Sequence, residues 1–487
     1  MVHTDHHGKG SYRPTTKPSQ TSIRKARPKQ ETPPVVTLSE KLTRNALESQ
    51  YIDLFWNLYL PKPVTFSFWK PSSIHHEAKW AEYTSNSAPQ SAILKCALSA
   101  LSASKVGRDT RDRDLTRRGI ELYGKALMML SKELKSPGDA KPFGVLNCCR
   151  ILALYEVRSS WQQTHNLTCF QQINDVGASA ENWKGHISGL LNLVRLRSPE
   201  DFSHPGTHEL FLEARYNGTI AALSARTGTF LSGAEWMTKP WSNRSKDAID
   251  MAMDVLVQIP GVLEEWETIS ARPENSEDHA KLDLFVTHCS NINRELRAWY
   301  GQFIIICEER DPSCTEALRR GLDNPAQQVH LPDILAQAGL HRLYAMTIYW
   351  TSCAILRATM DLVFHKYSET LFPRLGEHQA ANSDILKYCI CIALSAKYFL
   401  KPDFGLFTTL SLSHAGTCLV RMLADHRNCY PNVDTNDVEE LKRLMDLVQG
   451  SGGFDAWVTW KCGMDDSSLR KRGTGPNEPV LRLCLGG

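Results

Sequence analysis

Cysteine and histidine are the residue types of this 487-residue chain that could bind a metal ion. A zinc binuclear cluster needs six cysteines in a short basic segment, because pairs of thiolates share its two ions. No cysteine precedes Cys96, and the close pairs Cys148-Cys149 and Cys389-x-Cys391 fall in apolar segments with helical spacing. Adjacent helical residues point about 100° apart, so they chelate one ion poorly. The spacing therefore predicts no metal site at the cysteines.

The histidine pairs and the known catalytic motifs give no chemistry either. His6-His7 and His75-His76 are not part of a set of Cys and Asp ligands at metal-binding spacing, which favours surface histidines over metal ligands. The sequence contains no His-Glu-x-x-His, no Gly-x-Ser-x-Gly and no Gly-x-x-x-x-Gly-Lys-Ser/Thr. We predict that the protein is not an enzyme, with no catalytic residue, no cofactor-binding residue, no cofactor and no metal ligand.

A third group of residues could line a small-molecule pocket. Trp183, His186 and Arg195 lie on or beside one amphipathic segment, and Tyr155 and Trp161 lie upstream. The other interpretation is that these residues pack one helix against another. Aromatic residues at helical spacing favour the packing interpretation.

The N-terminal residues 1–37 hold the one strongly charged segment. They carry seven Lys/Arg and two Asp/Glu, a local balance of +5 that leaves −2 for the rest of the chain. Within them, Arg24, Lys25, Arg27 and Lys29 form a basic cluster. Two interpretations stay open for this cluster: a nuclear-import or phosphate-contacting patch, and a solvated basic tail. Phosphate attraction alone gives salt-sensitive binding, so we expect DNA to be bound only weakly or indirectly.

Residues 38–463 show apolar positions at helical spacing and no strand alternation. We predict an all-α protein, a large multi-helix bundle or helical superstructure with a disordered, proline-containing tail at 1–37 and a loosely ordered C-terminal tail at 464–487. The helices are predicted at about 38–60, 77–83, 93–107, 115–136, 143–157, 182–196, 209–232, 247–258, 278–309, 332–367, 382–400, 405–428 and 436–449.

Three details of this prediction concern particular residues. In the first helix, the stripe of Leu47, Tyr51, Leu54, Phe55 and Leu58 is expected to face the core. Gly107 is expected to end the helix that begins near residue 93. The polar residues 159–181, which show no period, are expected to form a loop.

The remaining composition concerns the compartment. The N-terminus has no apolar signal region, and the longest apolar runs fall short of the roughly 18 residues that a membrane span needs. We therefore expect no membrane association. Without a secretory route, the fourteen cysteines are expected to be reduced and buried.

Several short motifs occur in a characteristic order. They are Phe55-Trp56 before Pro61, Leu98-Ser99-Ala100-Leu101-Ser102-Ala103, Leu122-Tyr123-Gly124-Lys125-Ala126-Leu127, Leu154-Tyr155-Glu156, and Trp183-Lys184-Gly185-His186-Ile187-Ser188-Gly189-Leu190. In this order they resemble the fungal-specific transcription factor domain, the regulatory region of zinc binuclear cluster regulators. The resemblance covers about residues 50–235 and becomes a generic helical similarity through about 460. Two departures are Ser198 in place of the usual glycine at the turn and a longer 159–181 segment.

This resemblance implies a nuclear transcription regulator whose helical region controls activity, mediates dimerisation or senses a small molecule, without catalytic residues. Such proteins often control secondary-metabolite gene clusters. Because the chain has no zinc-cluster module, we expect an auxiliary or truncated regulator in the nucleus. Its expected partners are other transcription-regulatory proteins or a second copy of the chain, with a small-molecule effector. The alternatives are a non-regulatory accessory protein or enzyme of a biosynthetic cluster, and a zinc cluster encoded by an upstream exon.

Overall fold

The computed structural model of the protein describes residues 40–60, 75–136, 142–163, 169–271, 278–310, 312–367 and 382–399, with isolated positions between 412 and 444. Over these residues the secondary structure is helical and contains no strand, so the predicted all-α class is confirmed. The chain divides into two compact units, Met1–Ala46 and Leu47–Gly487. Both predicted tails, the basic cluster at Arg24, Lys25, Arg27 and Lys29, and most of residues 400–463 lie outside the described residues.

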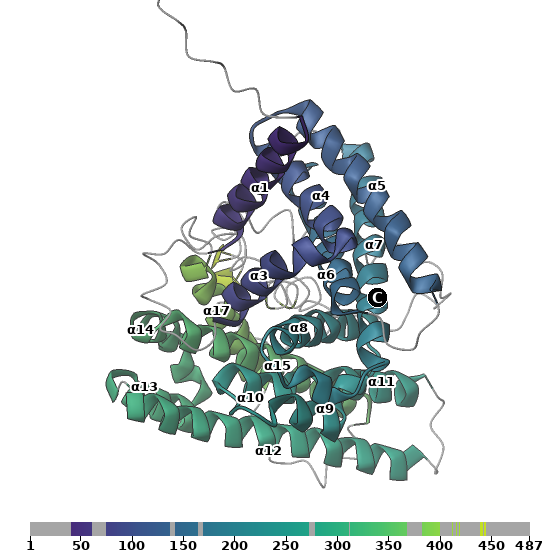
Figure 1. The fold of residues 1–487 in the computed structure, drawn as a ribbon. Coiled ribbons are helices and arrows are strands. Elements are labelled where there is room, and N and C mark those ends of the chain that lie inside the picture. Colours follow the sequence, from purple (N-terminus) through teal and green to yellow (C-terminus); the bar gives the residue numbers. More distant parts are fainter. Residues whose placement is uncertain are drawn as a thin grey trace, which may run out of the picture. The chain divides into compact units, whose positions relative to one another are not determined.

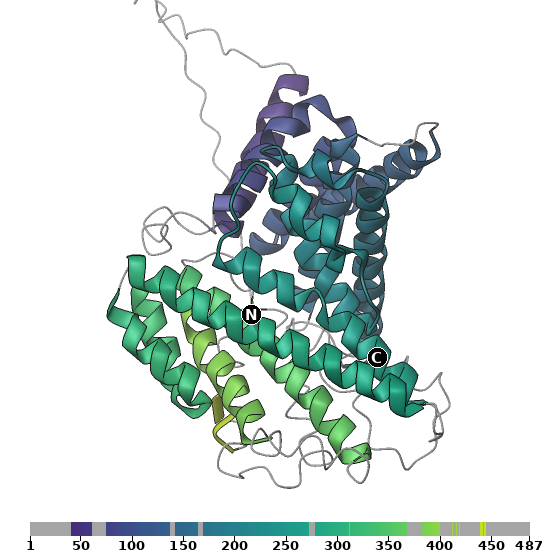
Figure 2. The same ribbon diagram turned by 90° about the horizontal axis from the view of Figure 1, so that it is seen from below.

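The helices divide into two groups, each around its own hydrophobic core (Figure 1, Figure 2). The first group comprises α1 (Glu40–Tyr59), α3 (His75–Ser87), η1 (Ala88–Gln90), α4 (Ala92–Asp109), α5 (Arg113–Lys135), α6 (Phe143–Gln163), α7 (Cys169–Arg195), η2 (Pro199–Phe202), α8 (Thr207–Ala225), η3 (Phe230–Ser232), α9 (Ala234–Thr238) and η4 (Lys239–Trp241). The second comprises α10 (Ala248–Leu256), α11 (Ile259–Ser270), α12 (Asp278–Arg310), η5 (Pro312–Cys314), α13 (Thr315–Asp323), η6 (Pro325–His330), α14 (Leu331–Ala338), α15 (Leu340–Lys366) and α17 (Asn382–Phe399).

Three helices of the first group, α6, α7 and α8, contribute to both cores, and α6 does so through Ala153 in the second core. On α8, Leu210 and Phe211 pack in the first core, and Ile220 and Leu223 pack in the second. On α7 the order is reversed, since Ile187 packs in the second core and residues from position 190 onward pack in the first. These helices therefore link the two cores, and the side chain of Leu191 on α7 packs against both.

Helix α6 lies at the centre of the first core. Its residues from Val145 to Glu156 are all buried. The buried Asn147 side chain accepts a hydrogen bond from Trp80 Nε1 at 3.2 Å and donates to Thr84 Oγ1 at 3.0 Å. Both partners lie on α3, so this amide fixes α3 against α6.

The predicted core-facing stripe of α1 is confirmed at Phe55 and wrong at its three leucines. Phe55, Trp56 and Tyr59 are buried, whereas Leu47, Leu54 and Leu58 are each more than 40% exposed. The Trp56 ring packs edge-on against the ring of Trp80 on α3, with centroids 5.7 Å apart. Aromatic side chains bury more area than leucine, and their position on the helix therefore decides which face turns inward.

Gly107 does not end a helix. It lies inside α4, and a Cβ at this position would lie 2.6 Å from the backbone nitrogen of Thr116 on α5. Gly119 of α5 is equally close to α4, where a Cβ would lie 2.6 Å from the backbone nitrogen of Ser104. These two glycines let α4 and α5 pack backbone against backbone.

The predicted loop at 159–181 is wrong over the described part of that range. Residues up to Gln163 continue α6, and α7 begins at Cys169 and runs without interruption to Arg195. The segment has no proline and contains Gln, Ala and Glu, which favour helix. The absence of an apolar period indicates only that a segment lacks a buried stripe, and it does not argue against a helix.

Three other helix boundaries differ from the prediction. The predicted 332–367 helix is two helices, because Gly339 adopts φ +135°, which a helix does not allow. Helix α8 ends at Ala225 rather than near 232, since Arg226 takes a left-handed conformation. A helix that the sequence did not predict, α11, follows α10, and Pro260 lies in its first turn, where a backbone N–H has no partner within the helix.

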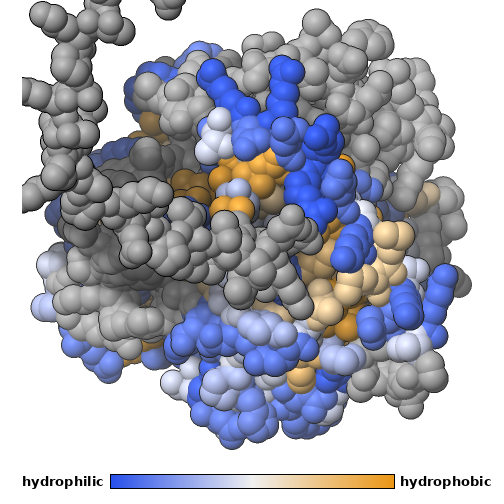
Figure 3. Space-filling view, turned by 45° about the horizontal axis from the view of Figure 1, so that its top comes forward, coloured by the Kyte–Doolittle hydropathy of each residue, from blue (hydrophilic) through white to orange (hydrophobic). Residues whose placement is uncertain are grey.

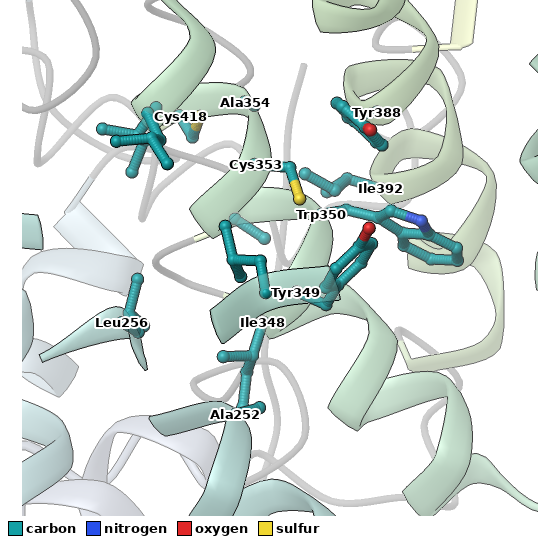
Figure 4. Packing of buried hydrophobic residues seen from close by; sticks show 14 of the residues in the cluster. Ala252, Leu256, Ile348, Tyr349, Trp350, Cys353, Ala354, Tyr388, Ile392 and Cys418 are labelled. Atoms are coloured by element: carbon teal, nitrogen blue, oxygen red, sulfur yellow. The ribbon is translucent and has the colours of Figure 1, made fainter. Parts of the chain in front are cut away.

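The second core is built around α15 (Figure 4). Tyr349, Trp350 and Cys353 of this helix lie against Tyr388 and Ile392 of α17. The Trp350 Nε1–H donates to Gln328 Oε1 at 2.7 Å, which satisfies the buried indole. Every described cysteine is buried, as predicted, and none of them forms a disulfide. None of the described helices is long and apolar enough to cross a membrane.

Candidate functional site

A group of polar side chains lies where α5, α6 and α7 meet. It consists of Ser104, Tyr123, Tyr155, Glu156 and His186, and is called here the tyrosine cluster. The rings of Tyr123 and Tyr155 stack with centroids 4.3 Å apart and planes 17° apart. Tyr123 Oη bonds the carboxylate of Glu156 and lies 3.0 Å from His186 Nε2. Ser104 Oγ donates to Tyr155 Oη at 3.1 Å, so four helices contribute to one hydrogen-bonded group.

The hydrogen bonds assign the protons of this cluster. The Tyr123 hydroxyl has one proton, and it donates that proton to the Glu156 carboxylate. The bond between Tyr123 Oη and His186 Nε2 therefore requires the imidazole to donate, which selects the tautomer with the proton on Nε2. Burial raises the pKa of Tyr123, and the hydrogen bond to Glu156 raises it further. Burial lowers the pKa of His186 to about 4, so its imidazole is neutral at pH 7.

Neighbouring apolar residues position each member of the cluster. On α5, Leu122 and Ala126 are buried beside Tyr123 and hold that face of the helix inward. On α7, Trp183 and Ile187 flank His186 and pack in the second core. Tyr123 and His186 themselves are only half-buried, so the cluster has one edge that reaches solvent.

The arrangement suits recognition better than bond-making. Ser104 is the hydroxyl that could act as a nucleophile, yet it is buried and bonded to Tyr155. The Tyr123 hydroxyl and His186 Nε2 are bonded to each other within the cluster. At the half-buried edge, a small molecule or a partner side chain could exchange hydrogen bonds with Tyr123 or His186. Among the residues that the structure describes, no group of three or more His, Cys, Asp or Glu side chains could hold a metal ion.

The residues predicted as a pocket or a packing set separate in the structure. His186 and Tyr155 meet in the tyrosine cluster, Trp183 is buried in the second core, and the exposed Arg195 lies 5.5 Å from the ring centroid of Phe230. The side chain of Trp161 lies outside the described part of the chain. Packing is therefore the right interpretation for Trp183.

Sequence reasoning did not single out Tyr123 and Glu156 as site residues. Both occur in the short motifs that carry the family resemblance, so the signal was present in the order of those motifs. Spacing along the chain does not show which helices become neighbours, and Tyr123 is 33 residues from Glu156 and 63 from His186.

A second constellation of charges surrounds α8. Arg150 of α6 lies 2.5 Å from Glu213, and both side chains are almost fully buried. Arg215 pairs with Asp254 and lies 4.8 Å from the ring centroid of Trp241. Each of these charges has a partner of opposite sign, which is typical of ion pairs that stabilise a fold.

No protein-family model, no curated protein and no solved structure matches the chain.

We predict that His186 makes stability depend on pH. Its pKa of about 4 in the folded protein lies below the ordinary value of 6.5. As the pH falls below 6.5, the unfolded chain takes up a proton at this position and the folded protein does not. The free energy of unfolding should therefore fall between pH 6.5 and pH 4, by up to about 3 kcal/mol, and stay flat above pH 7.

Urea unfolding at pH 7 and pH 5 checks this prediction. The variant His186→Gln keeps a donor for Tyr123 but does not titrate, so its midpoint should depend less on pH than that of the unmodified protein. The control variant is His288→Gln, which replaces a half-buried histidine of α12 outside the tyrosine cluster. An equally steep loss of stability in His186→Gln would show that His186 is not held neutral in the fold.

Proposed function

We propose that this chain is a transcription-regulatory protein of the fungal-specific transcription factor domain type. Its helical body binds regulatory proteins or a small-molecule effector, and it acts as an auxiliary or truncated regulator without its own zinc-cluster module. It acts in the nucleus, possible targets being the genes of a secondary-metabolite cluster. The observation that supports this proposal most is the convergence of the motif residues Tyr123, Tyr155, Glu156 and His186 in one hydrogen-bonded cluster.

This convergence supports the proposal because the motifs are far apart in the sequence. Tyr123, Glu156 and His186 lie on three different helices, and each belongs to a different motif. Chance similarity in three short motifs gives no reason for their polar residues to bond one another. A shared helical architecture gives such a reason, since the motifs would then mark the positions where its helices are held together.

The proposal is tested by the location of a tagged protein and by transcript levels after deletion of the gene. We expect nuclear accumulation and altered transcripts of target genes, such as neighbouring genes. Replacing Arg24, Lys25, Arg27 and Lys29 by alanine should reduce the nuclear fraction if this patch directs import. The same four substitutions in a protein fused to an independent import signal are the control. A cytosolic protein with unchanged transcripts would contradict the regulatory function.

DNA binding by the purified chain separates the auxiliary form from a complete regulator. We expect weak binding that is independent of sequence and falls steeply with salt, because only phosphate attraction is available. Sequence-specific binding by the chain alone would contradict the auxiliary form.

An enzyme or accessory protein of a biosynthetic cluster is the second candidate. The observation in its favour is that tyrosine, glutamate and histidine are acid–base residue types and lie within one cluster. The two candidates differ in one outcome: turnover lost in His186→Gln with folding intact would favour the enzyme.

A further inference from the structure

The outward face of α5 carries an apolar stripe. Ile120, Met128 and Leu134 are 55%, 69% and 46% exposed, and Gly124 and Leu127 between them are half-buried. Positions 120, 124, 127, 131 and 134 follow one another at three and four residues, so they share one side of the helix. These residues, with Met128 beside them, are called here the α5 stripe. Figure 3 shows one face of the molecule, on which some apolar side chains are exposed between hydrophilic ones.

The fold accounts for only one apolar side chain of this stripe, Leu127, which packs against the first core. Leu122, Ala126 and Leu130 form the buried face of α5 and already attach it to the first core. Single exposed apolar residues are ordinary, but Ile120, Met128 and Leu134 lie on the outward side of one helix, with Gly124 and Ser131 between them, and such a grouping indicates an interaction surface. Gly124 is a further sign, since a Cβ there would meet nothing within 4 Å. A helix-interior glycine costs about 1 kcal/mol relative to alanine, and here it leaves the backbone open to close approach from outside.

The charges around the stripe are mainly positive. Arg113 and Lys135 lie near its two ends, and Lys125 and Lys132 lie along one side. These four side chains are exposed and form no ion pair within the described part of the chain. Two acidic residues of α5 are already paired, Asp114 with Arg117 at 2.7 Å and Glu121 with Arg118 at 3.4 Å. The surface therefore combines an apolar centre with unneutralised cations.

We propose that the α5 stripe binds an acidic amphipathic helix of another protein. From Ile120 to Leu134 the stripe spans about 21 Å, the length of four helical turns, so a helix of about 16 residues would cover it. Apolar residues of that helix would pack on Ile120, Met128 and Leu134, and its carboxylates would pair with the flanking lysines and arginine.

The charge of α5 decides between this partner and a second copy of the chain. Pairing α5 with α5 would bring lysines and arginines of both copies together, and like charges facing each other across an interface are unfavourable. An acidic helix neutralises the same cations. The proposal goes beyond the regulatory function, because it concerns the chemistry of a partner and holds equally for an accessory protein.

Fluorescence anisotropy with two labelled peptides tests the proposal on the full chain. The first peptide has about 16 residues, with leucine at every third or fourth position and glutamate at most others; the second has lysine in place of glutamate. We expect the glutamate peptide to bind with a micromolar dissociation constant that weakens with salt, and the lysine peptide not to bind. Met128→Glu should weaken binding by about tenfold or more.

Leu284 supplies the matched control, since it is 70% exposed on α12, away from the stripe. Leu284→Glu adds the same charge at an equally exposed leucine and should leave binding unchanged. If Met128→Glu fails to fold, the double variant Lys132→Glu with Lys135→Glu replaces it in the binding test. This double variant should also weaken binding of the glutamate peptide. The proposal is overturned if the glutamate peptide does not bind, if both peptides bind equally, or if Leu284→Glu weakens binding as much. Self-association that Met128→Glu abolishes would also overturn it, in favour of a second copy. None of these outcomes bears on the localisation and transcript tests.

Discussion

Replacing Glu213 by alanine is expected to lower the free energy of unfolding by about 3 to 5 kcal/mol. Glu213 and Arg150 are 3% and 6% exposed, and Arg150 donates from Nε at 2.6 Å and approaches from Nη2 at 2.5 Å. Arg150 also lies 5.0 Å from the ring centroid of Trp80. Removing the carboxylate takes this counter-charge away from a buried guanidinium, and breaking a buried ion pair is among the most destabilising single changes in a protein interior.

Urea unfolding followed by circular dichroism measures this effect. The matched control is Arg118→Ala, because Arg118 and Glu121 form an exposed pair at 3.4 Å whose loss should change stability by less than about 1 kcal/mol. The double variant Arg150→Met with Glu213→Leu should recover much of the loss, since it removes both charges and leaves neither unpaired. Equal losses in Glu213→Ala and Arg118→Ala would contradict the buried pair.

Adding one methyl group to α5 is expected to have opposite effects at two glycines. Gly119→Ala should destabilise the protein by about 1 to 3 kcal/mol, because the new Cβ would lie 2.6 Å from the backbone of Ser104 and α4 would have to move away. Gly124→Ala should stabilise it by up to about 1 kcal/mol, because its Cβ meets nothing and alanine favours helix.

Thermal and urea unfolding of the two variants test this pair directly. Each variant controls for the other, since both add the same group to the same helix five positions apart. The loss of helix content, followed by circular dichroism, gives the unfolding midpoint of each variant. A destabilised Gly124→Ala would mean that the outer face of α5 is covered within the chain, and it would count against a free α5 stripe.

Helices that the sequence predicted well have either an apolar period or proline on both sides. The bounds of α12 and α17 lie within one residue of those predicted, since Pro273 and Pro312 flank the first and helical spacing runs through the second. The prediction missed the first half of α7 because that part of the sequence has no apolar period to detect. The prediction that the leucines of α1 face the core was wrong, because burying the three large aromatic side chains of this helix removes more apolar area from water than burying its row of leucines.

The candidate site shows where sequence reasoning ends. Local spacing placed His186 correctly on a helix, but it could not pair His186 with Tyr123, because that contact depends on how α5 and α7 lie in three dimensions. Gly107 and Gly119 illustrate the same limit. A glycine that ends a helix and a glycine that admits a neighbouring backbone are identical in sequence, and only packing distinguishes them.

The sharing of α7 and α8 between the two cores has a practical consequence for anyone who maps activities onto this protein. A fragment that stops after α9 would keep Ile187, Ile220 and Leu223 but lose the helices that cover them. Such a fragment would expose apolar surface that is buried in the intact protein, and it would bind other proteins non-specifically in a pull-down experiment. Interaction sites on this chain are therefore better assigned with point substitutions in the intact polypeptide than with nested deletions.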